Sequence, residues 1–462
     1  MILIFLIDLV VVVSLILLGH RRLEAALPLF CFYLILMPIE SKIVIPGVFD
    51  LTTERIAMMT VLTLFVMQKP RGYNGSVPMK RLMFFHVAWA ICSTIYSIST
   101  ATSLKQLIGQ VVEYYVLYLV LLRTISSIET VYKIVYSMML AMSLCCVFGV
   151  IEAYAQWSIL SIFPSNLWIV YGGPGPLFVE WGRGLRIRST FPHPILFGDA
   201  LAMSIPLTVF LLSSPKMSGR RHILWAVLIL MLWAIYKTSS RGPWLAVGLS
   251  FLLLFLLVRN KVRKYLTVLA VLSVVVLVAR PGIWDTVENL YKATQDSTNP
   301  SGASYEYRNA LTNAISGAVR KDIARSLLGY GLGTFREKGL DIDFLGGVRR
   351  WYTCDDNWAL FIYETGYIGF VIVIMLLAVP LLVALRSYIR LPRPQKYLSA
   401  VLFIALLGFS FELLSVAAYA WGQQAFMAWI LMGLAISYPN LVARDLRKSA
   451  AVTPPLQLAL AV

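Results

Sequence analysis

Long apolar runs separated by short polar segments dominate the pattern of the chain. Runs such as "LIFLIDLVVVVSLILLG" and "WLAVGLSFLLLFLLV" are close to the roughly 20 residues that a helix needs to cross the hydrocarbon core of a bilayer. The pattern predicts an all-α, polytopic transmembrane helical bundle of about 12 to 14 spans. The predicted spans are 2–19, 23–40, 54–68, 82–99, 105–122, 131–157, 193–213, 222–239, 242–258, 264–279, 357–385, 397–413 and 416–437.

Composition supports a single integral membrane domain over residues 1–462. Hydrophobic residues make up 59% of the chain and charged residues only 14%, whereas soluble domains carry about 25% charged residues. The first run lacks a basic start and a small-residue cleavage site, so we expect it to be a retained span. The five cysteines show no CxxC spacing and the four histidines are scattered, so we expect no metal and no cofactor.

The net charge of +17 is explained by topology, and we reject a nucleic-acid partner. Alternate short loops carry 22 Lys and Arg residues, against five in the short loops between them. Because basic residues concentrate in cytoplasmic loops, this asymmetry sets the orientation of the bundle. The predicted cytoplasmic segments are 20–22, 68–81, 123–133, 213–222, 259–264, 386–396 and the tail 444–448.

Two longer loops, 158–192 and 280–356, then lie outside the cytoplasm. The second contains a predicted amphipathic helix in "SYEYRNALTNAISGAVRKDIARSLLG", with apolar residues such as Leu311 and Ile315 at helical spacing. It closes with "GYGLGTF", which resembles a phosphate loop but lacks its lysine and its following Ser or Thr. We therefore interpret this stretch as a tight turn at the membrane surface.

Arginines collect on the predicted outer face. Arg183, Arg186 and Arg188 lie in the first outer loop, Arg241 begins a span, and Arg308 lies on the amphipathic helix. A guanidinium group binds phosphate through two hydrogen bonds and stays charged. Each arginine alone could equally extend to the interface or bind lipid headgroups nonspecifically. Together they favour a site for a polyprenyl diphosphate, whose charged head lies at the membrane surface.

Acidic residues stand where the second outer loop enters a span. Asp355 and Asp356 precede Asn357, and Glu364 lies about two turns farther along. A carboxylate near arginines could act as a general base on a sugar hydroxyl. The same residues could instead cap the helix, and Glu364 could make a hydrogen bond between helices.

Four ordered segments between about 186 and 375 resemble the O-antigen polymerase and ligase family, the Wzy-like and WaaL-like membrane glycosyltransferases. The resemblance is carried by "RIRSTFPHPILFGDALAMSIPL" (186–207), "SSRGPWLAVGLSFLLL" (239–254), the 307–335 stretch that begins "YRNALTNAI", and "DDNWALFIYETGYIGFVIVI" (355–374). In this chain Asp356 replaces a histidine that is the proposed base of the family's ligases. The "YRNAL" segment also lacks the family's tryptophan.

The resemblance implies a GT-C-like, inverting, metal-independent glycosyltransferase in the bacterial cytoplasmic membrane, with its active site on the outer side. The donor would be a glycan on undecaprenyl diphosphate. Asp356, or failing that Asp355, would be the base. Arg188, Arg241 and Arg308, with Arg186 beside them, would hold the diphosphate, while Asn357 and Glu364 would orient the acceptor.

The aspartate in place of histidine favours a polysaccharide polymerase that extends a lipid-linked repeat unit. The alternatives are a ligase that passes the glycan to lipid A core or protein, and a flippase or transporter for the same lipid-linked sugar. Implied partners are the undecaprenyl-diphosphate-linked glycan, membrane lipid, a chain-length regulator and a flippase.

Overall fold

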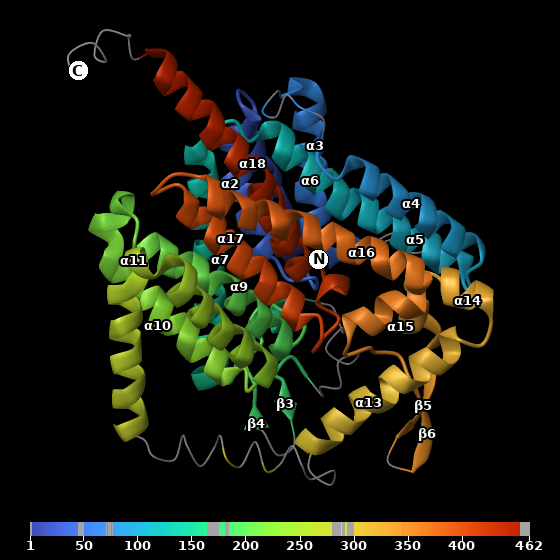
Figure 1. Ribbon diagram of the computed structural model, residues 1–462. Coiled ribbons are helices and arrows are strands. Elements are labelled where there is room, and N and C mark those ends of the chain that lie inside the picture. The colour runs from blue at the N-terminus through green and yellow to red at the C-terminus, as the bar shows by residue number, and fades with distance from the viewer. Residues whose placement is uncertain are drawn as a thin grey trace.

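The computed structural model is a bundle of long helices whose connecting elements gather at its two ends (Figure 1). The structure describes residues 2–44, 50–70, 72, 75, 77–163, 175–180, 184–279, 288, 292, 300–344 and 346–452. Arg183 and parts of both long loops lie outside these residues.

Each of the predicted spans contains a helix. In chain order the bundle helices are α1 (Ile2–Gly19), α2 (Leu27–Leu36), α3 (Thr53–Gln68), α4 (Lys80–Ile95), α5 (Thr100–Gln110), α6 (Val116–Thr124), α7 (Ile128–Ala155), α9 (Pro194–Leu212), α10 (Arg221–Lys237), α11 (Arg241–Ala279), α16 (Asn357–Arg390), α17 (Lys396–Glu412) and α18 (Gly422–Val452). The π-helical turn η2 (Val111–Tyr115) joins α5 to α6, and the short 3-10 helices are η1 (Leu23–Ala25), η3 (Ile159–Ile162), η4 (Pro215–Arg220) and η5 (Ala418–Ala420).

The membrane character of the bundle is confirmed. Among the described residues, eight helices are long and apolar enough to cross a bilayer. The other predicted spans are shorter helices of 10 to 17 residues, or the second half of α11. The last span begins six residues later than predicted, because η5 occupies the chain before Gly422.

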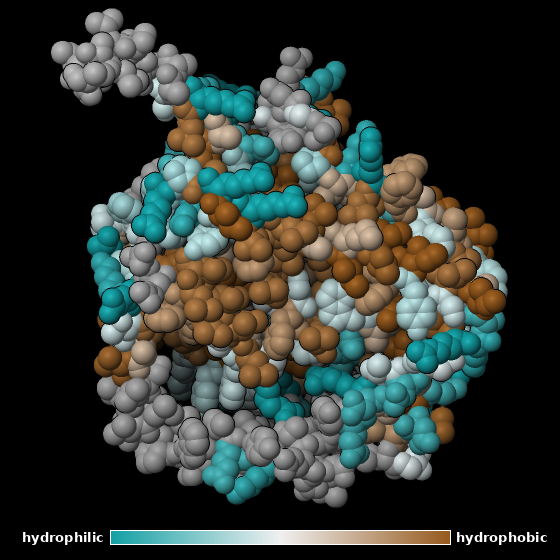
Figure 2. Space-filling view, viewed as in Figure 1, coloured by the Kyte–Doolittle hydropathy of each residue, from teal (hydrophilic) through white to brown (hydrophobic). Residues whose placement is uncertain are grey.

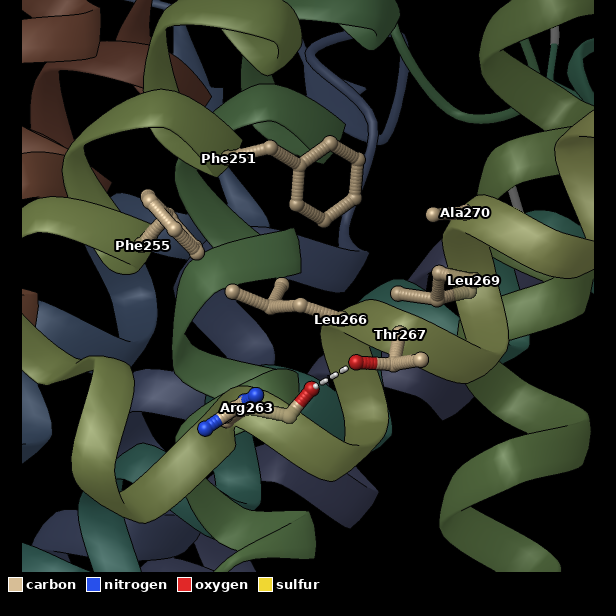
Figure 3. A pocket seen from close by; sticks show the side chains of 7 residues that line it. All are labelled: Phe251, Phe255, Arg263, Leu266, Thr267, Leu269 and Ala270. Carbon is tan, nitrogen blue, oxygen red and sulfur yellow. Dashed lines mark hydrogen bonds between the residues drawn. The ribbon is translucent and has the colours of Figure 1, made fainter.

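The two spans predicted at 242–258 and 264–279 form the single long helix α11, which bends back on itself. Phe251 and Phe255 on its first half share one cavity of about 490 Å³ with Leu266, Leu269 and Ala270 on its second half (Figure 3). In a straight helix, at 1.5 Å per residue, Phe251 and Ala270 would lie about 28 Å apart. Because residues of both halves line one cavity, the two halves of α11 lie side by side, as the predicted pair of antiparallel spans requires.

The central helix of the bundle is α9. Within the apolar stretch of α9, 94% of the residues are buried. The helix packs against α7, α10, α11 and α17. Gly198 on α9 lies so close to Pro243 on α11 that an added Cβ would come within 2.6 Å of the proline ring. This close approach brings the first turns of α9 and α11 together.

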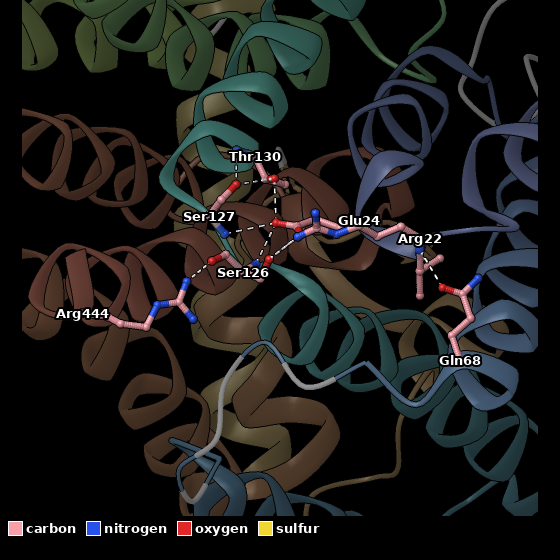
Figure 4. A network of polar contacts seen from close by, with 8 residues as sticks. Arg22, Glu24, Gln68, Ser126, Ser127, Thr130 and Arg444 are labelled. Carbon is pink, nitrogen blue, oxygen red and sulfur yellow. Dashed lines mark hydrogen bonds and ion pairs between the residues drawn. The ribbon is translucent and has the colours of Figure 1, made fainter. Parts of the chain in front are cut away.

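One end of the bundle gathers loops that the charge pattern predicts to be cytoplasmic (Figure 4). Buried Glu24 accepts hydrogen bonds from the backbone N–H groups of Ser126 and Ser127 and from the Thr130 hydroxyl. Arg22 pairs with the same carboxylate, and Arg444 donates to the Ser126 carbonyl. Segments 20–24, 123–130 and 444–448 are thus tied into one polar layer.

The opposite end carries the elements of the two long loops. These are the hairpin of β3 (Val179–Glu180) and β4 (Gly184–Leu185), the helices α13 (Pro300–Val319), α14 (Ile323–Leu328) and α15 (Thr334–Lys338), and the hairpin of β5 (Leu340–Phe344) and β6 (Gly347–Trp351). A further short pair, β1 (Lys42–Ile43) and β2 (Leu51–Thr52), joins α2 to α3. Seen from the side, the molecule carries a hydrophobic band across its middle, with hydrophilic residues above and below the band (Figure 2).

The predicted amphipathic helix is α13. Its apolar residues Leu311 and Ile315 are buried in a second core with Phe335, Ile342 and Tyr363. This small core fixes α13 against the first turns of α16, and so determines where Arg308 lies.

Candidate functional site

A cavity of about 420 Å³ lies at the end of the bundle that carries the long loops. Its polar lining comes from five separate segments of the chain. The polar and charged lining residues are Glu180, Arg186, His193, Ser240, Arg241, Arg308, Asp355 and Ser415.

The starts of three bundle helices meet at this cavity. His193 caps α9 by accepting a hydrogen bond from the Ile195 N–H at 3.1 Å, Arg241 begins α11, and Asp355 lies just before α16. Because a helix carries partial positive charge at its N-terminus, three such ends create a favourable field for an anion.

Arg241 and Arg308 bring positive charge to the cavity from distant parts of the sequence. Both are half-buried. The Nη2 of Arg308 donates to the Ser415 carbonyl at 3.1 Å, while its Nε–H is buried and lacks a hydrogen-bond acceptor within the described part of the chain. Buried donors are normally paired, so Arg308 retains capacity to bind an anion.

Arg186 lines the same cavity, but its guanidinium also ties the wall together. It pairs with Glu180 and donates to the Thr238 carbonyl at 2.9 Å and to the Ser240 hydroxyl at 2.8 Å. Arg186 is almost fully buried. It therefore holds the β3–β4 hairpin against the start of α11.

Arg188 does not line the cavity. Its guanidinium is buried and donates to the carbonyl oxygens of Pro176 and Pro192. Its backbone N–H donates to the Glu152 carboxylate at 3.0 Å. These contacts give Arg188 a structural place beneath the loop, and its predicted role in binding diphosphate stays a prediction.

The two adjacent acids occupy different positions. Asp356 is the N-cap of α16, because its Oδ1 accepts hydrogen bonds from the Trp358 and Ala359 N–H groups at 2.8 and 3.1 Å. Asp355 lines the cavity. Burial raises the pKa of Asp355 above its ordinary value, and the Arg308 charge opposes part of that rise. Of the pair, Asp355 is the one that lines the cavity.

Asn357 fastens the start of α16 to the segment after α17. Its N–H donates to the Leu413 carbonyl at 2.8 Å, and its side-chain Oδ1 accepts from the Tyr419 N–H at 2.7 Å. The side chain is fully buried and does not line the cavity. Its position supports the capping interpretation more than contact with an acceptor.

Glu364 fills the glycine-rich turn. Its carboxylate accepts a hydrogen bond from the Gly333 N–H at 2.9 Å, and its carbonyl accepts from the Gly331 N–H at 2.9 Å. The "GYGLGTF" stretch thus wraps a carboxylate of this chain, as a tight turn. Gly366 has a φ of 69°, and a Cβ there would meet the Leu327 carbonyl at 2.0 Å, so glycine allows the turn to pack on α16.

Four polar lining residues were missed by sequence reasoning, namely Glu180, His193, Ser240 and Ser415. His193 and Glu180 lie near the arginines of the first outer loop, and a motif centred on "TFPHP" could have singled out the histidine. Ser415 follows an apolar span without any local polar pattern. Only the three-dimensional packing brings it to Arg308.

The cavity also has an apolar side. Leu245 on α11 and Leu414 after α17 line it, and they are 64% and 55% exposed on the surface of the bundle. Phe411 and Ile195 complete this side. A charged chamber therefore adjoins an apolar rim, as an amphiphilic ligand requires.

Comparison with known proteins agrees with these observations. Residues 226–374 match the family model described as O-antigen ligase. No curated protein matches the chain at a significant level. The match covers Arg241, Arg308, Asp355 and Asp356, and it confirms the resemblance stated from the sequence. Residues 226–374 are thus similar to the O-antigen ligase family, and this similarity supports the O-antigen polymerase and ligase family for the chain.

Proposed function

We propose that this membrane protein is a polysaccharide polymerase that transfers a glycan from undecaprenyl diphosphate to a lipid-linked repeat unit outside the cytoplasm. One observation carries the proposal. Arg241, Arg308 and Asp355, which are far apart in the sequence, line one cavity between three helix N-termini.

The donor would bind with its diphosphate against Arg241 and Arg308. Guanidinium groups match phosphate oxygens in geometry and charge. The exposed residues Leu245 and Leu414 would let the prenyl chain remain in lipid while the head group enters the cavity. The same arginines would stabilise the diphosphate as negative charge develops on it in the transition state.

Asp355 is the proposed general base. The acceptor hydroxyl gives its proton to this carboxylate as its oxygen forms a bond to the anomeric carbon. The bond from that carbon to the diphosphate oxygen breaks, and the electron pair leaves with the diphosphate. A single displacement of this kind inverts the anomeric centre. Asp356, the first candidate from sequence, has one oxygen engaged by two helix N–H groups, so the proposal moves to its neighbour.

Purified protein in detergent with lipid-linked repeat units tests this function. Extension of the glycan on a gel, with EDTA present and without ATP, is the expected result. Transfer that requires added lipid A core would instead support the ligase alternative. If neither extension nor transfer to lipid A core occurs, both the polymerase and the ligase are contradicted. The transporter alternative then remains.

The concentration of charge favours an enzyme over a transporter. A transporter is expected to carry polar groups along a path through its midplane. Arg241, Arg308 and Asp355 instead collect at one end of the bundle, near the starts of their helices. This placement suits a site that meets its substrates at the membrane surface.

A further inference from the structure

Two buried carboxyl groups lie directly behind the arginine cavity, and the reaction proposed above does not use them. Asp199, near the start of α9, and Glu412, the last residue of α17, are both fully buried. The two carboxyl groups interact with each other.

The pair has few other partners. Glu412 Oε2 accepts a hydrogen bond from the Ser415 hydroxyl at 2.9 Å. Glu412 Oε1 and both Asp199 oxygens have no other hydrogen-bond donor among the residues that the structure describes. Because buried carboxylates are usually surrounded by donors, a purely structural role does not explain this arrangement well.

Glu412 lies against the segment that carries Arg241 and is linked to Arg308 through Ser415. Ser415 connects it to Arg308, since the Ser415 carbonyl accepts from the Arg308 Nη2 at 3.1 Å. Gly242, next to Arg241, lies against it so closely that an added Cβ would be 3.0 Å from Glu412 Oε2. The Glu412 charge also attracts Arg308.

We propose that Glu412 is a positioning residue that fixes Ser415 and so holds Arg308 in place for a diphosphate. This inference rests on the proposed function, because it assumes that Arg308 binds the diphosphate of the donor. Glu412 acts through Ser415 and need not touch the substrate.

Binding of undecaprenyl diphosphate to the purified full-length chain tests the inference. Glu412→Ala should weaken binding about tenfold, as expected when a buried hydrogen bond that orients a ligand-binding group is lost. Glu412→Gln should bind within about twofold of the unaltered protein, because its amide oxygen still accepts from Ser415 and its N–H group can donate to Asp199. Rescue by glutamine separates positioning from a requirement for the charge itself.

Ser415→Ala provides a second variant that makes only a small change in volume. It removes the hydroxyl link to Glu412 but keeps the carbonyl that Arg308 uses, and we expect about fivefold weaker binding. If Glu412→Ala does not fold, the affinities of Ser415→Ala and Glu412→Gln for undecaprenyl diphosphate are compared instead. Weaker binding by Ser415→Ala alone supports the positioning role, and equal binding by the two variants contradicts it. Glu24→Ala is the matched control, because Glu24 is a buried carboxylate with hydroxyl partners at the other end of the bundle. It should lower thermal stability without changing the Kd.

The outcomes separate the two proposals. If Arg308→Ala weakens binding but Glu412→Ala and Ser415→Ala do not, Glu412 has no positioning role. Equal losses of binding in Glu412→Gln and Glu412→Ala would also contradict the positioning role of Glu412. If the unaltered protein does not bind undecaprenyl diphosphate, the proposed function fails, and this inference fails with it.

Discussion

Buried carboxylates lie near both ends of the bundle, and their surroundings differ. At the end with the predicted cytoplasmic loops, both oxygens of Glu24 accept hydrogen bonds, from Ser126, Ser127 and Thr130 (Figure 4). At the other end, Asp199 and Glu412 share few donors and adjoin a cavity lined by arginines. The first arrangement joins loops by giving both oxygens of the carboxylate hydrogen-bond donors. The second keeps charge next to a cavity that a ligand can enter. This difference distinguishes the structural cluster around Glu24 from the candidate site beside Asp199 and Glu412.

The largest expected effect comes from the proposed base. Asp355→Asn should lower the rate of glycan transfer by about 10²-fold or more, as loss of a general base does. Asp356→Asn should stay within a few-fold of the unaltered protein, because asparagine caps helices as well as aspartate does. Initial rates of chain extension, measured at equal amounts of protein in detergent, compare the two. Equal loss in both variants would contradict the assignment to Asp355.

The cavity arginines should give the next largest effect. Arg241→Ala and Arg308→Ala should each raise the KM for the lipid-linked donor by about 10- to 100-fold, the range expected for losing one charge-assisted contact. Lysine at either position should restore only part of the loss, because it lacks the paired donors of arginine. Complete rescue by lysine would rule out recognition through two hydrogen bonds.

Arg188→Ala is the matched control for those variants. Arg188 is buried and bonded to backbone carbonyl groups, so its loss should lower thermal stability and leave the donor KM of the remaining folded protein close to normal. A rise in KM equal to that of Arg308→Ala would instead return Arg188 to the diphosphate site.

A change at the structural end should act on stability and leave catalysis intact. Glu24→Ala leaves the N–H groups of Ser126 and Ser127 without their acceptor, and we expect a loss of about 2 kcal/mol in the free energy of unfolding. Thermal denaturation in detergent measures the loss, and the donor KM of the folded fraction should not change. A specific loss of transfer without loss of stability would erase the distinction between the two ends.

The pH dependence should give the smallest effect. Burial raises the pKa of Asp355, while the Arg308 charge lowers it in part. A base must be deprotonated, so activity should fall as the pH drops through this raised pKa. Arg308→Gln removes the opposing charge and should move the acid limb of the pH–rate profile to higher pH. A shift to lower pH would show that Asp355 and Arg308 are not coupled in this way.

The membrane spans were predictable from the sequence because each depends on a local property, the length of an apolar run. The predicted ends of the spans are less accurate where a helix continues into residues that are not apolar. The last span was predicted at 416–437, yet α18 continues to Val452, because "LVARDLRKSAAV" favours helix although it is polar. The basic segment 259–264 interrupts the apolar pattern and therefore predicts a loop between two spans. In the structure this segment lies within the single helix α11, at its bend.

The site was predicted only in part. The residue types and the end of the molecule could be inferred from charge and motif, but the choice between neighbours depends on tertiary contacts. Arg186 and Arg188 are two residues apart, yet one lines the cavity and the other binds the Pro176 carbonyl. Asp355 and Asp356 are adjacent, and only the start of α16 decides which one becomes the cap. Asp199 and Glu412 come from helices whose packing has no local signal.

A density map of the protein with undecaprenyl-diphosphate-linked repeat unit bound to the Asp355→Asn variant would test the account most directly. We predict density for the diphosphate between Arg241 and Arg308, with the prenyl chain leaving past Leu245 and Leu414. Diphosphate density elsewhere, for example beside Arg263 at the bend of α11, would contradict the assignment of the arginine cavity as the donor site.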